Sequence, residues 1–147
     1  MTREYDIDGD WIKKSAVKFS GSPVYGKFSG KPLKPGDPYL KPPSATSRFQ
    51  LGICNDVRST LHDGPCGITR EWTFISPFPG GKVTEPGDSG SAILDKDYNV
   101  AAMAWGGNQY PLDGDLTFGT PFGAVIEDIE RRMGWEPASC VWIGGTT

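Results

Sequence analysis

Glycine and proline are spread so densely along the chain that few stretches remain for long helices. Of the 147 residues, 20 are glycine and 13 are proline. Both residues weaken helix interiors and favour turns, so a chain interrupted this often is expected to consist of short strands joined by turns. The composition therefore predicts an all-β architecture.

The chain length and the balance of residue types fit one globular domain. A chain of 147 residues can bury roughly 68–70% of its unfolded surface, which is enough for a true core. Hydrophobic residues make up 37% and charged residues 22%, as in globular proteins. The net charge is −3, so we expect neither nucleic acid nor an anionic membrane as a partner. No apolar run approaches the roughly 20 residues of a membrane helix.

The cysteines and the start of the chain bear on the cellular compartment. Met1–Asp10 is acidic and polar, unlike a secretory signal. Cys54, Cys66 and Cys140 are an odd number, which without a signal predicts reduced thiols in a cytoplasmic protein. A Cys54–Cys66 bridge across a hairpin is the alternative if the mature chain is secreted.

The first half of the chain alternates between apolar runs and turn-rich segments. Ala16–Phe19 is predicted as a short N-terminal strand, and Gly21–Ser47, rich in Gly, Pro, Ser and Lys, as a long loop or arm. Phe49–Thr60 and Ile68–Ser76 are predicted to form a hairpin, with His62–Pro65 as its turn. Residues 1–47 would thus precede the main folded unit.

The second half predicts three further strands and one helix. The strands are Ala92–Leu94, Val100–Trp105 and Leu116–Gly119. The helix is expected to begin with Thr120 as cap and Pro121 in its first turn, and to end at Gly134. Its apolar residues recur at helical spacing: Phe122, Val125, Ile126, Ile129 and Met133. The predicted unit thus spans residues 48–134, and residues 135–147 form a tail.

The run Pro86–Ser91 reads Pro-Gly-Asp-Ser-Gly-Ser and can present a nucleophile. A serine hydroxyl is a weak nucleophile that needs an exposing turn, a base and donors for the oxyanion. Gly87 and Gly90 permit backbone angles closed to other residues. Such a turn can aim the N–H groups of Gly87 and Ser89 at one point, while Asp88 points inward to lock the loop. The alternative is an ordinary glycine-rich turn.

What surrounds this run resembles the C-terminal barrel of trypsin-like (chymotrypsin-fold) serine peptidases, in particular the intracellular trypsin-like domains of fungal proteins. The resemblance rests on Pro86–Leu94, Trp105–Gly106, Thr117–Pro121 and the helix that follows. A looser similarity includes Thr46–Asn55 and Glu71–Trp72, so the resemblance covers roughly residues 46–134. It implies a six-stranded antiparallel Greek-key barrel, one lobe of that fold, with a C-terminal α-helix.

The resemblance also implies roles for particular residues. Ser89 would be the catalytic nucleophile, and the N–H groups of Gly87 and Ser89 would form the oxyanion hole. A substrate strand would pair with the backbone of a wall formed by Ala104, Trp105 and Gly106.

The same resemblance implies a specificity pocket whose floor is Val83, six residues before the nucleophile. An aliphatic floor offers no anion to a Lys or Arg side chain. We therefore expect a neutral or apolar residue before the cut.

The chain departs from the family in lacking an evident general base. Residues 1–45 are too short and too rich in Pro and Gly to build the N-terminal barrel that carries the His and Asp in the family. His62 is the chain's one histidine and lies 27 residues before Ser89, beside Asp63 in a predicted hairpin turn. We interpret His62 as a solvent-exposed turn residue. To act as the general base it would have to come within about 3 Å of the Ser89 hydroxyl.

Three hypotheses follow. The chain is the nucleophile-bearing half of a peptidase whose His and Asp come from another chain or segment. Alternatively, it is a catalytically inactive, peptidase-derived module that binds a peptide or protein. In the third hypothesis Ser89 acts alone or with a lysine such as Lys82.

The first two hypotheses predict partners but no cofactor. An isolated lobe exposes a barrel face that a second polypeptide, a second copy of the chain or residues 21–47 would cover. No metal site is expected, since a lone histidine and scattered cysteines do not make a metal set. No cofactor is expected either, since phosphate-loop and dinucleotide fingerprints are missing.

Overall fold

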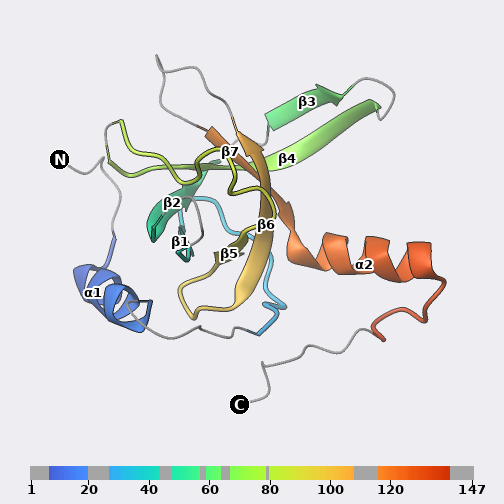
Figure 1. Ribbon diagram of the computed structural model, residues 1–147, viewed down its shortest axis with the longest axis horizontal. Coiled ribbons are helices and arrows are strands. Elements are labelled where there is room, and N and C mark those ends of the chain that lie inside the picture. Colours follow the sequence, from blue (N-terminus) through green and yellow to red (C-terminus); the bar gives the residue numbers. More distant parts are fainter. Residues whose placement is uncertain are drawn as a thin grey trace.

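The structure is a computed structural model that describes residues 7–19, 27–43, 48–56, 59–63, 67–78, 80–107 and 116–139. Within these residues two helices and seven strands follow one another along the chain (Figure 1). They are α1 (Gly9–Lys18), β1 (Pro38–Lys41), β2 (Gln50–Cys54), β3 (Ser59–Asp63), β4 (Gly67–Ile75), β5 (Ala92–Leu94), β6 (Val100–Gly107), β7 (Leu116–Pro121) and α2 (Phe122–Met133).

Six of these strands close into an antiparallel barrel. The strand order is β2-β1-β5-β6-β7-β4-β3, and an additional pairing of β2 with β4 closes the ring. The nine-residue strand β4 makes this possible, because its second half pairs with β2 and β7 while its first half pairs with β3. The β3–β4 hairpin therefore extends beyond the barrel (Figure 1). The expected six-stranded barrel with a C-terminal helix is confirmed.

The predicted N-terminal strand at Ala16–Phe19 is wrong, because these residues belong to and follow α1. The Asp8 side chain caps the helix by accepting the N–H of Asp10 at 2.9 Å. Trp11 and Ser15 face the barrel, where Trp11 Nε1 donates to the carbonyl of Lys96 at 2.8 Å. Four alternating residues are too few to distinguish a strand period from a helical one.

The predicted arm also needs correction, because it contains a barrel strand. β1 pairs along its whole length with β2, and Leu40 pairs with Leu94 of β5. Tyr39 and Leu40 are buried, and so is Leu33 before them. The barrel thus begins at Pro38 rather than at residue 48.

The predicted hairpin strand Phe49–Thr60 is two strands in the structure. β2 pairs with β1 and β4, whereas β3 pairs only with β4 among the described residues. His62 and Asp63, predicted in the turn, lie in β3 opposite Ile68 and Gly67. The rest of that predicted turn, residues 64 and 65, lies outside the described residues.

The C-terminal part follows the prediction closely, except at the start of α2. β5, β6 and β7 occupy the predicted segments, and Gly134 ends α2 with a φ of 70°. However, Thr120 and Pro121 belong to β7, and no side chain caps α2. The Thr120 hydroxyl instead donates to Glu71 on β4 at 3.3 Å.

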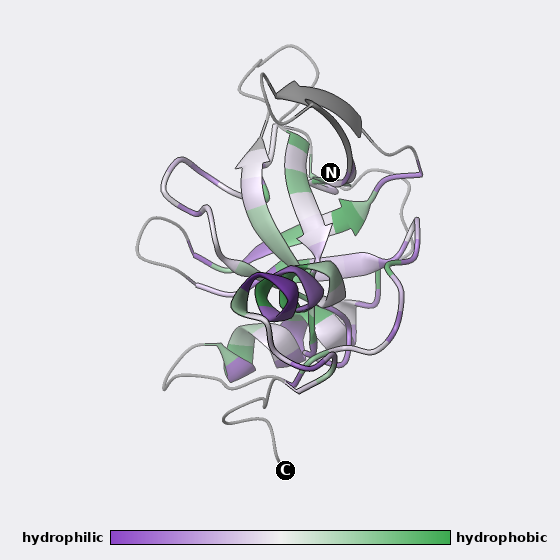
Figure 2. Cartoon of the chain, turned by 90° about the vertical axis from the view of Figure 1, so that its right-hand side faces the viewer, coloured by the Kyte–Doolittle hydropathy of each residue, from purple (hydrophilic) through white to green (hydrophobic). Residues whose placement is uncertain are grey.

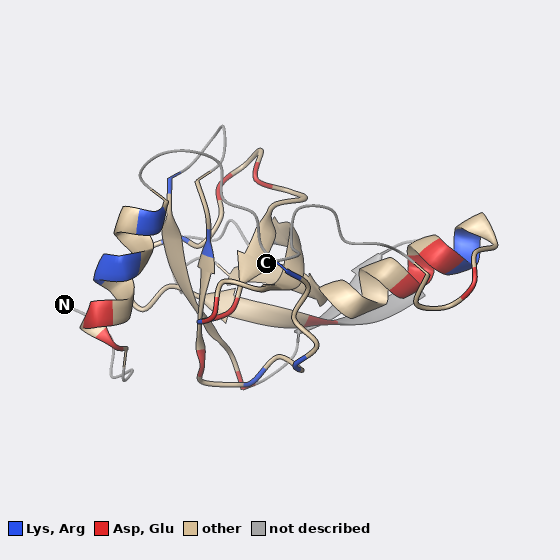
Figure 3. Ribbon diagram, turned by 90° about the horizontal axis from the view of Figure 1, so that it is seen from below, with Lys and Arg blue, Asp and Glu red and all other residues tan. Residues whose placement is uncertain are grey.

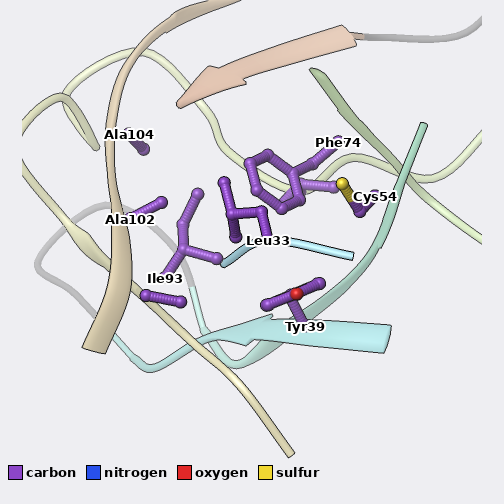
Figure 4. Close-up of a cluster of buried hydrophobic side chains, with 9 residues drawn as sticks. Leu33, Tyr39, Cys54, Phe74, Ile93, Ala102 and Ala104 are labelled. Atoms are coloured by element: carbon purple, nitrogen blue, oxygen red, sulfur yellow. The ribbon is translucent and has the colours of Figure 1, made fainter. Parts of the chain in front are cut away.

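The core fills the inside of the barrel. Figure 4 shows side chains from several strands converging there, and the buried cluster consists of Leu33, Tyr39, Cys54, Phe74, Val83, Ile93, Ala101, Ala102 and Ala104. A second buried cluster of Leu40, Leu51, Leu94 and Val100 packs against apolar residues of α1 and its C-terminal end. α1 thus covers one side of the barrel.

α2 projects away from the barrel, as Figures 1 and 3 show. Its contacts are with β6 and β7. Hydrophilic residues dominate its outer turns, which face the viewer in Figure 2. The predicted apolar stripe is therefore only partly buried, since Ile129 is 43% and Met133 59% exposed. Neither of the two described helices is long and apolar enough to cross a membrane.

Candidate functional site

Ser89 is exposed on a tight turn that leads into β5. Gly87 and Gly90 on either side have φ values of 98° and 91°, in the left-handed region that favours glycine. The N–H of Asp88 donates to the carbonyl of Glu85 at 3.0 Å, and the N–H of Ser91 donates to the carbonyl of Asp88 at 2.9 Å. The local sequence thus folds into a turn that presents the serine hydroxyl.

This turn is docked against β6. The N–H of Gly90 donates to the carbonyl of Ala104 at 2.6 Å, and the N–H of Ala104 donates to the carbonyl of Ser91 at 2.9 Å. The Oγ of Ser89 donates to the carbonyl of Trp105 at 3.2 Å. The structure therefore brings the predicted nucleophile to the predicted wall.

The wall itself is irregular. A bulge between Ala104 and Gly106 interrupts the pairing of β6 with β7, and Trp105 is the extra residue. The Trp105 ring lies 5.7 Å from that of Phe118 and remains 37% exposed. Both backbone groups of Ala104 already have partners in this docking, the Trp105 carbonyl accepts the Ser89 hydroxyl, and Gly106 pairs with Phe118 of β7. The pairing of a substrate strand with this wall stays a prediction.

The predicted oxyanion donors are backbone groups of the same turn. Within the described part of the chain, the N–H groups of Gly87 and Ser89 donate to no backbone carbonyl in this turn. They are the two donors that the resemblance assigns to an oxyanion, and this role stays a prediction.

Asp88 points into the protein and is 1% exposed. Its Oδ2 accepts the N–H of Glu85 at 2.8 Å. Lys41, at the end of β1, is fully buried, and its Nζ donates to the carbonyl of Pro42 at 2.8 Å. Burial lowers the pKa of Lys41, and the negative charges of Asp88 and Glu85 oppose this shift.

Sequence reasoning missed Lys41. It belongs to one of three Lys-Pro pairs in the stretch that was predicted to be a long loop or arm. Lys31 and Lys34, which open the other two pairs, are indeed exposed. Nothing in the local sequence distinguishes the buried lysine from these two.

The structure does not bring His62 to Ser89. His62 lies on β3, and Ser89 is docked on β6, with β7 and β4 between them in the sheet. Three strand spacings separate the two backbones by roughly 14 Å along the sheet. A general base must lie within about 3 Å of the Ser89 hydroxyl, or reach it through one bridging water molecule.

Val83 and Lys82, which were also predicted to take part in the site, have contrasting surroundings. Val83 is 1% exposed and belongs to the barrel core, where it packs against Gly52 and Phe74. Its role as the floor of a specificity pocket stays a prediction. Lys82 is exposed, unlike the desolvated lysines that activate a serine.

A cavity of about 440 Å³ lies at the other end of β5. It is lined by residues before and within β1 and by the turn after β5, including Leu33, Tyr39 and Asp97. It shares no residue with the turn that carries Ser89. Among the described residues, no group of three His, Cys, Asp or Glu side chains could hold a metal ion.

Comparison with known proteins identifies the architecture. No protein-family model matches the chain, and no curated protein sequence matches it. The solved structures that are similar to the chain include two bacterial proteases, each matched over 80% of this chain. One is a chymotrypsin from Cellulomonas bogoriensis, with a TM-score of 0.52 and 22% identity, and the other is protease A from Thermobifida fusca, with a TM-score of 0.55 and 19% identity. The barrel is one lobe of the chymotrypsin fold.

The chain corresponds to only part of these two proteases. The similar region covers 57% of the Cellulomonas chymotrypsin and 56% of the Thermobifida protease. At this level of identity the similarity concerns the fold, and catalysis is a separate question. The finer resemblance to fungal intracellular domains stays a prediction.

Proposed function

We propose that this chain is the nucleophile-bearing lobe of a trypsin-like serine peptidase, whose general base and orienting acid come from another chain or segment. The observation that carries the proposal is the position of Ser89. It is exposed on a turn flanked by two glycines with positive φ and docked on β6.

The proposed reaction is hydrolysis of a peptide bond through an acyl-enzyme. The external base takes the proton of Ser89 Oγ, and the oxygen attacks the substrate carbonyl carbon. The N–H groups of Gly87 and Ser89 then stabilise the oxyanion. When this intermediate collapses, the C–N bond breaks and the base returns the proton to the leaving amine; water, deprotonated by the same base, then hydrolyses the acyl-enzyme and Ser89 Oγ regains its proton. Because Ser89 Oγ now donates to the carbonyl of Trp105, the hydroxyl has to turn toward the base before it can react.

Substrate binding would use the edge of β6. An extended peptide can pair with the backbone of Trp105 and Gly106, with the Trp105 ring beside it. In this proposal Val83 remains at the floor of the specificity pocket. Because Val83 carries no negative charge, we expect the substrate residue before the cleaved bond to be neutral or apolar.

The need for a general base beside Ser89 is the main reason that the proposal includes a partner. His62 lies three strand spacings from Ser89, and the chain matches just over half of each similar protease. A second polypeptide, or a second copy of this chain, would supply the base and cover the exposed barrel face. Exposed apolar residues on and after α2 are compatible with such a contact: Ile129, Met133 and Trp135.

A second candidate function is a catalytically inactive module that holds an extended peptide or a partner's strand. The observation that favours it is the hydrogen bond from Ser89 Oγ to the Trp105 carbonyl, which occupies the hydroxyl within the wall. Binding by strand addition needs the backbone of Trp105 and Gly106 but no base.

Labelling with a fluorophosphonate probe distinguishes these functions. We expect Ser89 to react when the chain is mixed with an extract of its source cells, and Ser89→Ala to remain unlabelled. Labelling of the isolated chain as well would place the base within these 147 residues. A folded chain that stays unlabelled in both settings would exclude the peptidase and leave the binding module.

A further inference from the structure

Lys41 is one of the largest fully buried side chains in the described structure, and it ends in an ammonium group. An ammonium group in such a place is costly unless it is hydrogen-bonded and paired with a negative charge. The bond from Nζ to the carbonyl of Pro42 uses one of its three donors. This lysine therefore needs a neighbouring anion that is equally shielded from water.

The strand register leads from Lys41 to the nucleophile turn. β1 and β5 are antiparallel, and Leu40 pairs with Leu94. The chain after Leu40 therefore runs beside the chain before Leu94, toward Asp88. Asp88 is 1% exposed, so both Lys41 and Asp88 are shielded from water, and the negative charges of Asp88 and Glu85 favour the ammonium form of Lys41. Among the described residues, every buried side-chain nitrogen and oxygen has a hydrogen-bond partner.

We propose that Lys41 is a positioning residue for Ser89, holding the turn at Glu85–Ser91 against β1 through the charge of Asp88. Its importance for catalysis rests on the proposed function, whereas its effect on the turn does not. Asp88 stands directly between Gly87 and Ser89, so a fixed Asp88 also fixes the N–H groups on either side.

The physical reason is the cost of an unpaired buried charge. Removing one partner of a buried ion pair is strongly destabilising, whereas replacing both partners by neutral groups is often tolerated. Without the ammonium, the Asp88 carboxylate gains by moving to water, and the turn has to open for this to occur. The bonds that dock the turn on β6 would then weaken.

Hydrogen exchange of backbone amides, followed by NMR, tests this directly. In Lys41→Met we expect the amides of Asp88, Gly90 and Ser91 to exchange at least about tenfold faster, with little change in the β6–β7 ladder. Lys34→Met is the matched control, because Lys34 is exposed on the same segment of the chain. It should leave all of these amides unchanged.

Asp88→Asn supplies the second arm. Alone, it should also speed exchange in the turn, because it leaves Lys41 without its anion. Combined with Lys41→Met, it should restore protection to within about threefold of the unmodified chain, because the neutral pair carries no buried charge. If Lys41 acted only through the packing of its aliphatic side chain, the double variant would not regain this protection.

Two results would overturn the inference. One is unchanged exchange in the turn of folded Lys41→Met or Asp88→Asn. The other is a double variant that is at least as perturbed as the two single variants together, or that fails to fold. Neither result depends on labelling of Ser89, so failure of the peptidase proposal would leave a positive exchange result standing.

Discussion

At the scale of single residues, two glycines show two different physical needs. Gly119 lies in β7, where an added Cβ would come within 2.8 Å of a ring carbon of Phe74. Gly90 has open space around it, but its φ of 91° is strained for any other residue. One position is restricted by packing, and the other by backbone conformation.

Gly119→Ala should destabilise the barrel by overpacking. Phe74 is fully buried and cannot move without disturbing the core, so we expect a loss of about 1–3 kcal/mol in the free energy of unfolding. Urea denaturation measures this, with Gly30→Ala as control because its Cβ would meet nothing within 4 Å. Equal midpoints for the two variants would contradict this account of Gly119.

Gly90→Ala should act through backbone strain alone. We expect it to cost about 1–3 kcal/mol of stability, or else to shift the turn and lengthen the bond between Gly90 N and the carbonyl of Ala104. The same urea experiment shows the first effect, and faster exchange of the Gly90 amide shows the second. The idea fails if the variant matches the original chain in both measurements.

At the scale of secondary-structure elements, α2 is tied to the segment that follows it by a buried glutamate. Glu130 is 4% exposed although it lies in a projecting helix, and its Oε1 accepts the N–H of Ala138 at 3.1 Å. The N–H of Trp135 donates to the carbonyl of Glu130 at 2.9 Å. This residue therefore holds the chain after Gly134 against the helix.

Glu130→Ala should release that segment. Loss of the acceptor is expected to cost about 1 kcal/mol and to raise the exchange rate of the Ala138 amide several-fold. Glu130→Gln keeps an acceptor oxygen and should show a smaller effect, and Glu127→Ala, on the exposed face, should show none. Equal effects of the changes at positions 127 and 130 would refute the contact.

The elements also show which predictions can be made from local sequence. The two strands β5 and β6 were predicted, and the turn between them is held by local chemistry. Asp95 Oδ1 accepts the N–H groups of Asp97 and Asn99 at 2.9 and 3.0 Å. The helix α1 was not predicted. Its stabilising contacts are with distant residues, such as the hydrogen bond of Ser15 Oγ with Tyr98 Oη at 3.0 Å.

At the scale of the whole molecule, the barrel interior contains groups that must stay neutral. Burial raises the pKa of the Cys54 thiol from its usual 9.0 to about 12 and that of Tyr39 from 10.0 to about 12. Cys54 is a free, buried thiol in the structure, and Cys66, its partner in the bridge considered from the sequence, lies outside the described residues.

These shifts predict that stability falls at alkaline pH. Above pH 9 the unfolded chain loses the Cys54 proton while the folded chain keeps it, so the folded state binds more protons. The free energy of unfolding should therefore be unaffected by this thiol below about pH 8 and decrease from about pH 9 toward pH 12. Urea denaturation at several pH values measures it.

Cys54→Ala should flatten this decrease, leaving the part due to Tyr39. An alkaline slope that is the same in the variant and in the original chain would contradict the assignment to Cys54. In the original chain, the Cys54 thiol should also resist thiol reagents until the chain unfolds, because Cys54 is 1% exposed.

The sequence by itself determined what depends on neighbouring residues. The exposed turn at Ser89 follows from Gly87 and Gly90, whose positive φ is a local property. The end of α2 follows in the same way from Gly134. The strands that follow this turn were also predicted from local patterns, whereas the barrel was predicted from the resemblance to trypsin-like peptidases.

Features that depend on the closed barrel became visible only in the folded structure. The fold buries Lys41, although its Lys-Pro pair looks like the two exposed ones, and it also buries Asp88. It set Ser89 against the Trp105 carbonyl and His62 three strands away. The reason is that burial and the distance between remote residues are properties of the assembled sheet, which no stretch of sequence carries alone.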